Sequence, residues 1–291
     1  MKNVLVTGSY GQLGSEIKSI ANKYPSFHFL FTDVDTLDIC NKQAITDYCT
    51  QHAVDYILNC AAYTAVDKAE DADQQALCYS INAEAVKNLG EVAEERGCKI
   101  IQISTDYVFD GTNYMPYTED MSTNPQSVYG NTKLKGEELL MQACTQAIVI
   151  RTSWLYSTFG NNFVKTMIKL GTERSQLNVI FDQIGTPTYA ADLADTMLTI
   201  LQKTNENQVQ FTPGIYHYSN EGVCSWYDFT IAIHSISGIT QCKTLPIESK
   251  EYPTKAPRPH YSVLNKHKIK STFSIEIPHW NESLARCIGR M

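Results

Sequence analysis

The sequence predicts an α/β fold with a doubly wound parallel sheet and a smaller C-terminal lobe. Short β-branched runs alternate with longer segments of helical character through the first half of the chain. A glycine-rich turn follows the first of these runs directly. After residue 154 the alternation loosens, and proline and aromatic residues become more frequent. Strand–helix–strand repeats with right-handed crossovers indicate a Rossmann-type sheet.

The expected elements follow in chain order. Five strands are expected, at 3–7, 28–32, 56–60, 99–104 and 148–152. Crossover helices are expected at 12–22, 42–51, 74–96 and 127–143. Further on, we expect helices at 162–170, 190–202 and 281–287, and a strand at 177–181. These elements predict a dinucleotide-binding domain over 1–155 that also takes in about 177–215, and a substrate-binding lobe formed by 216–291 with part of 156–176.

Composition excludes several classes of protein. The 291 residues are 43% hydrophobic and 19% charged, which is typical of a folded globular chain. The net charge of −7 is spread along the sequence without a basic run, so no nucleic-acid partner is expected. No apolar run approaches the roughly 20 residues that span a bilayer, and we expect no signal peptide and a cytoplasmic location. The nine cysteines are scattered without a C-x-x-C pair, which argues against disulfides and zinc.

The glycine-rich turn predicts a phosphate site. Gly8, Gly11 and Gly14 follow the first strand and open a helix, with Gln12 and Leu13 between the last two glycines. Glycines allow a tight turn and a close backbone approach, while the helix amino terminus offers free N–H groups to a pyrophosphate. The alternative is a turn that only packs helix against strand, and its place after the first strand favours the phosphate site.

Residues after the second and third strands extend the predicted cofactor site. Asp33 ends the second strand near the position where an acidic side chain meets the adenosine ribose, although Asp35 and Asp38 compete for this role. An acidic residue favours NADH on simple electrostatics, but the choice between NADH and NADPH stays open. The remaining cofactor residues are expected just beyond these strands, namely Asp38, Ile39, Ala62, Tyr63 and Thr64.

The predicted catalytic residues lie at the start of the helix at 127–143. Tyr129 and Lys133 are four residues apart and therefore share one helix face. A phenol with an ordinary pKa of ~10 protonates an alkoxide better when a nearby ammonium lowers that pKa. Such a pair is often only a surface pair. Here the strand at 99–104 delivers Thr105 and Asp106 to the same sheet edge, so hydroxyl, phenol and ammonium converge.

This arrangement resembles the extended short-chain dehydrogenases, whose Ser/Thr-Tyr-Lys set matches Thr105, Tyr129 and Lys133. The resemblance implies that Tyr129 donates the proton. It implies that Lys133 holds the nicotinamide ribose and lowers the pKa of the phenol, and that Thr105 hydrogen-bonds the reacting oxygen.

Within that superfamily the chain resembles the dTDP-4-dehydrorhamnose reductase family. The matching words cover nearly the whole chain and include NCAAYTAVDKAE (59–70), STDYVFDG (104–111), RTSW (151–154), QIGTPT (183–188) and GIYHYSN (214–220). The resemblance implies reduction of the C4 ketone of dTDP-4-dehydro-L-rhamnose to dTDP-L-rhamnose with NADPH or NADH, feeding surface polysaccharide. Related dehydratases carry Thr-Asp-Glu where this chain has Tyr107, and without that base an elimination has no evident agent.

The resemblance also implies substrate contacts. Thr105 and Asp106 are expected to contact the sugar, and Trp154 to pack on its ring, the alternative for Trp154 being a core aromatic. Arg258 is expected to pair with the diphosphate, and a surface arginine is its alternative. Asn162 reaches the nucleotide or caps the following helix.

Some relatives use magnesium at an acidic subunit contact. Glu16 could contribute to such a site, but residues 189–191 offer no carboxylate, so no metal site is predicted.

Three alternatives to this reductase stay open. Another nucleotide-sugar reductase or an epimerase of the same superfamily would use a similar site. The regulatory subunit of methionine adenosyltransferase resembles the same family and acts as a binding partner, so the fold alone does not guarantee turnover. The sequence is compatible with a homodimer but does not establish one.

Overall fold

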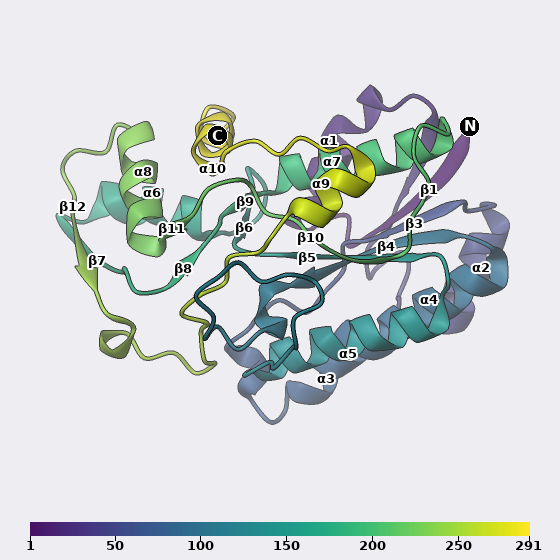
Figure 1. The fold of residues 1–291 in the computed structure, drawn as a ribbon, viewed down its shortest axis with the longest axis horizontal. Coiled ribbons are helices and arrows are strands. Elements are labelled where there is room, and N and C mark those ends of the chain that lie inside the picture. Colours follow the sequence, from purple (N-terminus) through teal and green to yellow (C-terminus); the bar gives the residue numbers. More distant parts are fainter.

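The computed structural model describes residues 1–291 and is built around one six-stranded parallel sheet (Figure 1). The strand order is β10-β5-β4-β3-β1-β2. The strands are β1 (Lys2–Thr7), β2 (Phe27–Phe31), β3 (Tyr56–Asn59), β4 (Lys99–Thr105), β5 (Ala147–Thr152) and β10 (Gly214–His217). The central strand β5 is buried along its whole length, which explains its apolar run at 147–150. The predicted fold class is confirmed.

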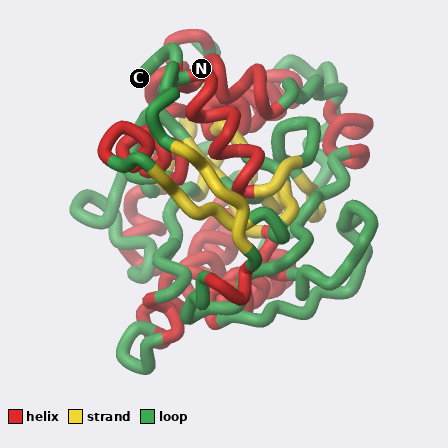
Figure 2. The backbone as a smooth tube through the Cα atoms, turned by 90° about the vertical axis from the view of Figure 1, so that its left-hand side faces the viewer, coloured by secondary structure: helices red, strands yellow, loops and turns green.

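Helices cover both faces of this sheet, as Figures 1 and 2 show. One face carries α1 (Gln12–Ile20), α7 (Ala190–Asn205) and α9 (His267–Phe273), whose apolar residues join a core of 25 buried side chains. The other carries α2 (Lys42–Gln51), α3 (Gln75–Tyr79), α4 (Ala85–Arg96) and α5 (Val128–Ala143). Its core of 18 buried side chains includes Ile45, Leu89 and Leu140. None of the helices is both long and apolar enough to cross a membrane.

The switch point of the sheet lies at β1. This strand pairs in parallel with β2 on one side and β3 on the other, and the last register pair with β3 is Thr7 with Asn59. The connections therefore leave β1 and β3 toward opposite faces. Ligands of doubly wound sheets bind in the crevice that this reversal opens at the carboxyl ends of the strands.

The segment expected as one helix at 74–96 is interrupted. A π-helical turn, Ser80–Glu84, separates α3 from α4. The turn brings the backbone of Asn82 against α5, where a Cβ on Gly136 would lie 2.1 Å from the Asn82 carbonyl oxygen. Residue periodicity does not reveal such a single wider turn, which often marks a functional position.

A smaller lobe packs beside the sheet. It contains α6 (Phe163–Glu173), α8 (Trp226–Ile236) and α10 (Trp280–Ile288), with the strand pairs β7 (Gln176–Ile180) and β12 (Lys243–Ile247), β8 (Ile184–Gly185) and β11 (Cys224–Ser225), and β6 (Leu155–Tyr156) and β9 (Thr188–Tyr189). A third core of 13 buried residues lies within it.

The segment boundaries differ from the expected ones. β7 pairs with β12 in the smaller lobe rather than joining the dinucleotide domain, while β10 and α9 belong to the main sheet and its core. The chain therefore crosses between the main sheet and the smaller lobe more than once. These crossings depend on strand pairs whose members are far apart in the sequence. The binding roles of the two parts stay a prediction.

Candidate active site

The turn after β1 is shaped by glycines that leave no room for side chains. Gly8 has φ +63°, and a Cβ there would lie 2.6 Å from the backbone of Ala61. A Cβ on Gly14 would lie 2.5 Å from the Gly8 carbonyl oxygen. The turn, the first helix and the end of β3 therefore meet through backbone alone.

The amino terminus of α1 fits a bound pyrophosphate. Its N-cap is Gly11, which has no side chain to accept a hydrogen bond from the first turn. The N–H groups of Gln12 and Leu13 follow this uncapped position, so free donors and the positive end of the helix dipole lie at the crevice. These residues would hold the phosphates of a nicotinamide dinucleotide.

The predicted ribose residues lie beside this turn. Asp33 accepts hydrogen bonds from the backbone N–H groups of Tyr10 and Val34, both at 2.9 Å, and so braces the glycine turn. Asp38 is exposed and accepts from the N–H of Cys40 at 2.9 Å, while Ile39 is buried in the core. Contact of these residues with a ribose stays a prediction.

Asn82 is a site residue that sequence reasoning missed. Its side-chain oxygen accepts from the N–H of Tyr63 at 2.9 Å, and its amide donates to the Tyr63 carbonyl at 3.1 Å. The same amide donates to the Thr132 hydroxyl at 3.2 Å. The buried Asn82 therefore ties the loop with Ala62, Tyr63 and Thr64 to the predicted catalytic helix. No sequence pattern predicts the π-helical turn that orients the Asn82 side chain, and only the polarity of Asn82 itself could have marked this residue.

The start of α5 is fixed against the end of β4. Ser127 is the N-cap and accepts from the N–H of Gly130 at 3.1 Å. Glu70 accepts from the N–H of Val128 at 2.9 Å and satisfies a second free donor. A Cβ on Gly130 would lie 2.3 Å from the Tyr107 carbonyl oxygen, so only glycine lets the helix approach this closely.

Lys133 points inward to the sheet. Its side chain is buried, and Nζ donates to the carbonyl of Ile103 at 2.7 Å. Burial lowers the pKa of Lys133 to about 8, and the charge of Glu137 opposes this shift. The lysine thus lies at the carboxyl end of β4, one helical turn beyond Tyr129.

Tyr129 lies beside Thr105 and Tyr107. Burial raises the pKa of its phenol, and the nearby Thr105 hydroxyl opposes the rise. The expectation that Lys133 lowers this pKa differs from the structure, because the ammonium is bonded to Ile103 and burial dominates at the phenol. The Tyr107 ring contacts Tyr129 edge-on at a centroid distance of 5.6 Å.

Thr105 and Asp106 are both buried beside the phenol. The Thr105 hydroxyl donates to Oδ1 of Asp106 at 3.0 Å and accepts from the N–H of Tyr107 at 3.2 Å. Burial raises the pKa of Asp106 to about 6, while the nearby hydroxyls of Thr105 and Ser262 oppose the rise. Oδ2 of Asp106 is buried without a hydrogen-bond partner. The structure therefore brings Thr105, Tyr129 and Lys133 to one sheet edge.

Trp154 lies where the two parts of the molecule meet. It has φ +48° and stacks on Trp226 at 3.5 Å between ring centroids. A Cβ on Gly185 would lie 2.7 Å from its Cε2 atom, so glycine makes room for the indole. The indole packs against the smaller core while remaining partly exposed.

Asn162 and Arg258 each join the two parts. Asn162 caps α6 by accepting from the N–H of Lys165 at 3.2 Å, and it also donates to Gln12 Oε1 at 3.1 Å. The expected cap is therefore present, and contact of Asn162 with the nucleotide stays a prediction. Arg258 donates to Asp67 at 2.5 Å.

Glu16 is held by side chains of its own chain. Its buried carboxylate accepts from Ser157 at 2.7 Å, from Thr158 at 3.3 Å and from Arg290 at 3.2 Å. The structure gathers no group of three or more His, Cys, Asp or Glu side chains that could hold a metal.

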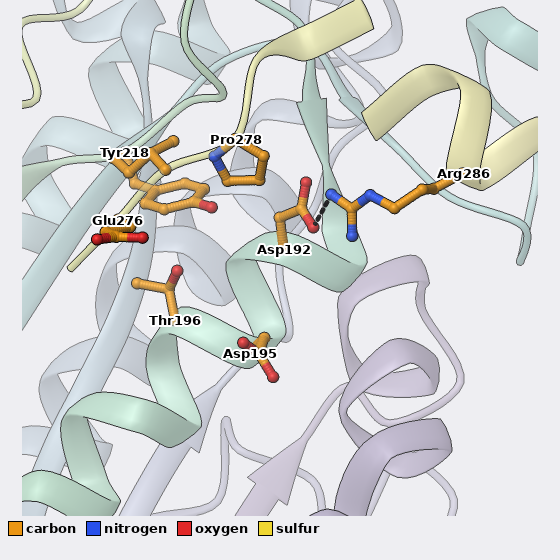
Figure 3. A pocket seen from close by; sticks show the side chains of 8 residues that line it. Asp192, Asp195, Thr196, Tyr218, Glu276, Pro278 and Arg286 are labelled. Carbon is orange, nitrogen blue, oxygen red and sulfur yellow. Dashed lines mark hydrogen bonds and ion pairs between the residues drawn. The ribbon is translucent and has the colours of Figure 1, made fainter. Parts of the chain in front are cut away.

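A cavity of about 360 Å³ lies between α7 and the segment that leads into α10 (Figure 3). Asp192 within it is bonded to Arg286 at 2.6 Å. Its lining comes from α7, from Tyr218 just after β10, from the segment before α10 and from α10, and includes none of Thr105, Tyr129 and Lys133.

Comparison with known proteins agrees with the geometry. A family model described as the RmlD substrate binding domain matches residues 1–291. The chain is 38% identical to the dTDP-4-dehydrorhamnose reductase of Aggregatibacter actinomycetemcomitans, with 98% of this chain and 97% of that protein covered. It is 37% identical to the spore coat polysaccharide biosynthesis protein SpsK of Bacillus subtilis, with 98% and 96% covered.

Solved structures agree as well. A dTDP-4-dehydrorhamnose reductase from Clostridium acetobutylicum superposes with a TM-score of 0.92 at 42% identity, covering 99% of both chains. One from Bacillus anthracis in complex with NADP superposes with a TM-score of 0.93 at 36% identity, covering 100% of both. The resemblance drawn from the sequence motifs is confirmed, and the chain belongs to the RmlD substrate binding domain family.

Proposed function

We propose that the protein reduces the C4 ketone of dTDP-4-dehydro-L-rhamnose to dTDP-L-rhamnose with NADPH or NADH, in the biosynthesis of surface polysaccharide. The observation that carries the proposal is the meeting of Thr105, Tyr129 and Lys133 at the carboxyl end of β4, within a chain similar over its whole length to reductases of this name. The NADP complex of the Bacillus anthracis relative supports the cofactor.

The residues divide into two binding sets. The cofactor set comprises Gly8, Gly11, Gln12, Leu13, Gly14, Asp33, Asp38, Ile39, Ala62, Tyr63, Thr64, Tyr129 and Lys133. The substrate set comprises Thr105, Asp106, Trp154, Asn162 and Arg258. Asn82 positions the first set by holding Tyr63 against the catalytic helix.

The reduction needs one hydride and one proton. When bound, the reduced nicotinamide supplies the hydride to C4 of the sugar. Tyr129 gives its phenolic proton to the carbonyl oxygen as negative charge develops there. The Thr105 hydroxyl, which donates to Asp106 in the free protein, turns its proton to the same oxygen. Lys133 holds the nicotinamide ribose from its place one helical turn along α5 from the phenol, where its Nζ is fixed by the Ile103 carbonyl.

Tyr107 favours reduction over elimination. It occupies the position at which related dehydratases carry a glutamate base. Burial raises the pKa of Tyr107 to about 12, so at neutral pH it is an uncharged phenol and a poor base. A carbonyl group in this site is therefore reduced without loss of water from the ring.

A coupled assay tests this function. The keto sugar nucleotide is generated from dTDP-glucose by the preceding dehydratase and epimerase, and the loss of reduced nicotinamide absorbance is followed after this protein is added. We expect consumption of NADPH or NADH in proportion to dTDP-L-rhamnose formed. Absence of oxidation with either cofactor would reject the reductase and favour a regulatory binding protein, and product of inverted configuration without oxidation would identify an epimerase.

A further inference from the structure

Arg258 is held in one orientation by Asp67. Its Nη2 donates to Oδ2 of Asp67 at 2.5 Å, while Oδ1 of Asp67 accepts from the N–H of Ala256 at 3.1 Å. One carboxylate thus fixes both the guanidinium and the backbone two residues before it. The flanking Pro257 and Pro259 restrict the backbone further.

Tyr107 supports the guanidinium from the side of the catalytic residues. The Arg258 Cζ atom lies 5.9 Å from the centre of the Tyr107 ring. The same ring contacts Tyr129 at 5.6 Å between centroids, with an interplanar angle of 80°. Direct contacts therefore run from Asp67 through Arg258 and Tyr107 to the predicted proton donor.

The second arm of the arginine lacks a partner. Nη1 of Arg258 is buried and forms no hydrogen bond, although this side chain helps to line a small cavity with Tyr107 and Ser127. A buried guanidinium N–H without an acceptor is unfavourable, and an anionic oxygen is its strongest partner. Because Asp67 binds only Nη2, Nη1 of the guanidinium remains able to donate to a phosphate oxygen.

We infer that Asp67 is a positioning residue that aims Arg258 at the diphosphate of the sugar nucleotide, and that Tyr107 sets the distance from this anchor to Tyr129. This inference rests on the proposed function and adds the residue that orients the substrate. Asp67 itself touches neither the sugar nor the cofactor. Its effect runs through the guanidinium, which anchors the diphosphate while the sugar ketone reaches the phenol.

A second ion pair provides a matched control. Asp71 pairs with Lys255 between the same two segments of chain. Removing Asp71 takes away one attachment of residues 252–260 but leaves Arg258 and its partner intact. Comparing the Asp67 and Asp71 variants therefore separates the orientation of Arg258 from the attachment of residues 252–260 in general.

The experiment measures dTDP and NADPH binding by calorimetry for the wild-type protein, Asp67→Ala, Asp67→Asn and Asp71→Ala. We expect Asp67→Ala to weaken dTDP binding about tenfold. Asp67→Asn should restore part of the loss, because its amide oxygen still accepts from Ala256. Asp71→Ala should stay within about twofold of wild type, and NADPH affinity should be unchanged in all three variants. In the coupled assay, Asp67→Ala should raise KM for the keto sugar more than it lowers kcat.

The sign of the change decides between two roles of the carboxylate. Tighter dTDP binding by Asp67→Ala would overturn the inference, because Asp67 would then compete with the diphosphate for Arg258. Unchanged binding, or an equal loss in Asp71→Ala, would overturn it too. These outcomes do not depend on turnover, whereas a wild-type protein that binds dTDP but leaves NADPH and NADH unoxidised in the presence of the keto sugar would contradict the proposed function alone.

Discussion

A Cβ on Gly8 would lie 2.6 Å from the Cα of Ala61, so the turn after β1 and the end of β3 touch through backbone alone. The two segments are more than fifty residues apart in sequence and flank the switch point of the sheet. Their contact determines how deeply a dinucleotide can enter between the first helix and the third strand.

Substituting Gly8 by alanine should abolish cofactor binding. The new methyl group would push the Ala61 backbone away, and φ +63° adds a strain of about 1–2 kcal/mol. Gly97→Ala is the control, because Gly97 has φ +69° with no atom within 4 Å of the added Cβ and so carries the strain without the clash. Calorimetry with NADPH should show loss of binding for the first variant only. Equal affinities in the two variants would contradict the assigned crevice.

Tyr129→Phe should separate binding from chemistry. The ring and its contact with Tyr107 remain, but the transferable proton is lost. We expect kcat to fall by roughly 10²–10⁴-fold, the usual contribution of a general acid. NADPH affinity should stay within about twofold. A variant that retained full kcat in the coupled assay would require a different proton donor.

Asp106 should make folding stability depend on pH in an uncommon direction. Its pKa is raised from 3.8 to about 6, so the folded state binds the proton more tightly than the unfolded chain. Stability should therefore fall as pH rises from about 4 to about 6 and level off above that, with up to about 3 kcal/mol at stake.

Asp106→Asn tests this assignment. The amide has nearly the same shape and does not ionise, so the decline in this pH window should be reduced. Urea unfolding of both proteins at about pH 4 and about pH 7 measures the difference. Identical pH profiles for the two proteins would show that another group governs this range.

Asn82→Ala should weaken the loop that carries Tyr63. Two backbone groups of Tyr63 lose their side-chain partner, and a buried group left unpaired costs about 1–3 kcal/mol. We expect lower thermal stability and weaker NADPH binding, with dTDP binding less affected. Asn3→Ala is a suitable control, because Asn3 also bonds two loop carbonyls, those of His52 at 2.8 Å and Ala53 at 3.2 Å, but lies at the amino end of β1, away from the residues of the cofactor set. Unchanged NADPH affinity in Asn82→Ala would remove Asn82 from the site.

Residue patterns predicted much of the main sheet. The strands at 3–7 and 148–152 lie within one residue of β1 and β5, because a strand buried on both faces needs a continuous apolar run. The helix at 42–51 matches α2, whose N-cap Asn41 accepts from the N–H of Ala44. Patterns could not place β7, because its partner β12 is more than sixty residues away and either part of the molecule would bury its apolar side chains.

The sequence by itself determined the glycine turn, the identity of the Thr105, Tyr129 and Lys133 side chains and the family, because local spacing and long motifs are written directly in the residues. Only the tertiary structure decided that Lys133 bonds the Ile103 carbonyl, that Asn82 holds Tyr63 and that Asp67 takes one arm of Arg258. These partners come together only when the parallel strands align their carboxyl ends and the second lobe folds back on them. Burial, which sets the pKa values of Tyr129 and Asp106, likewise exists only in the folded chain.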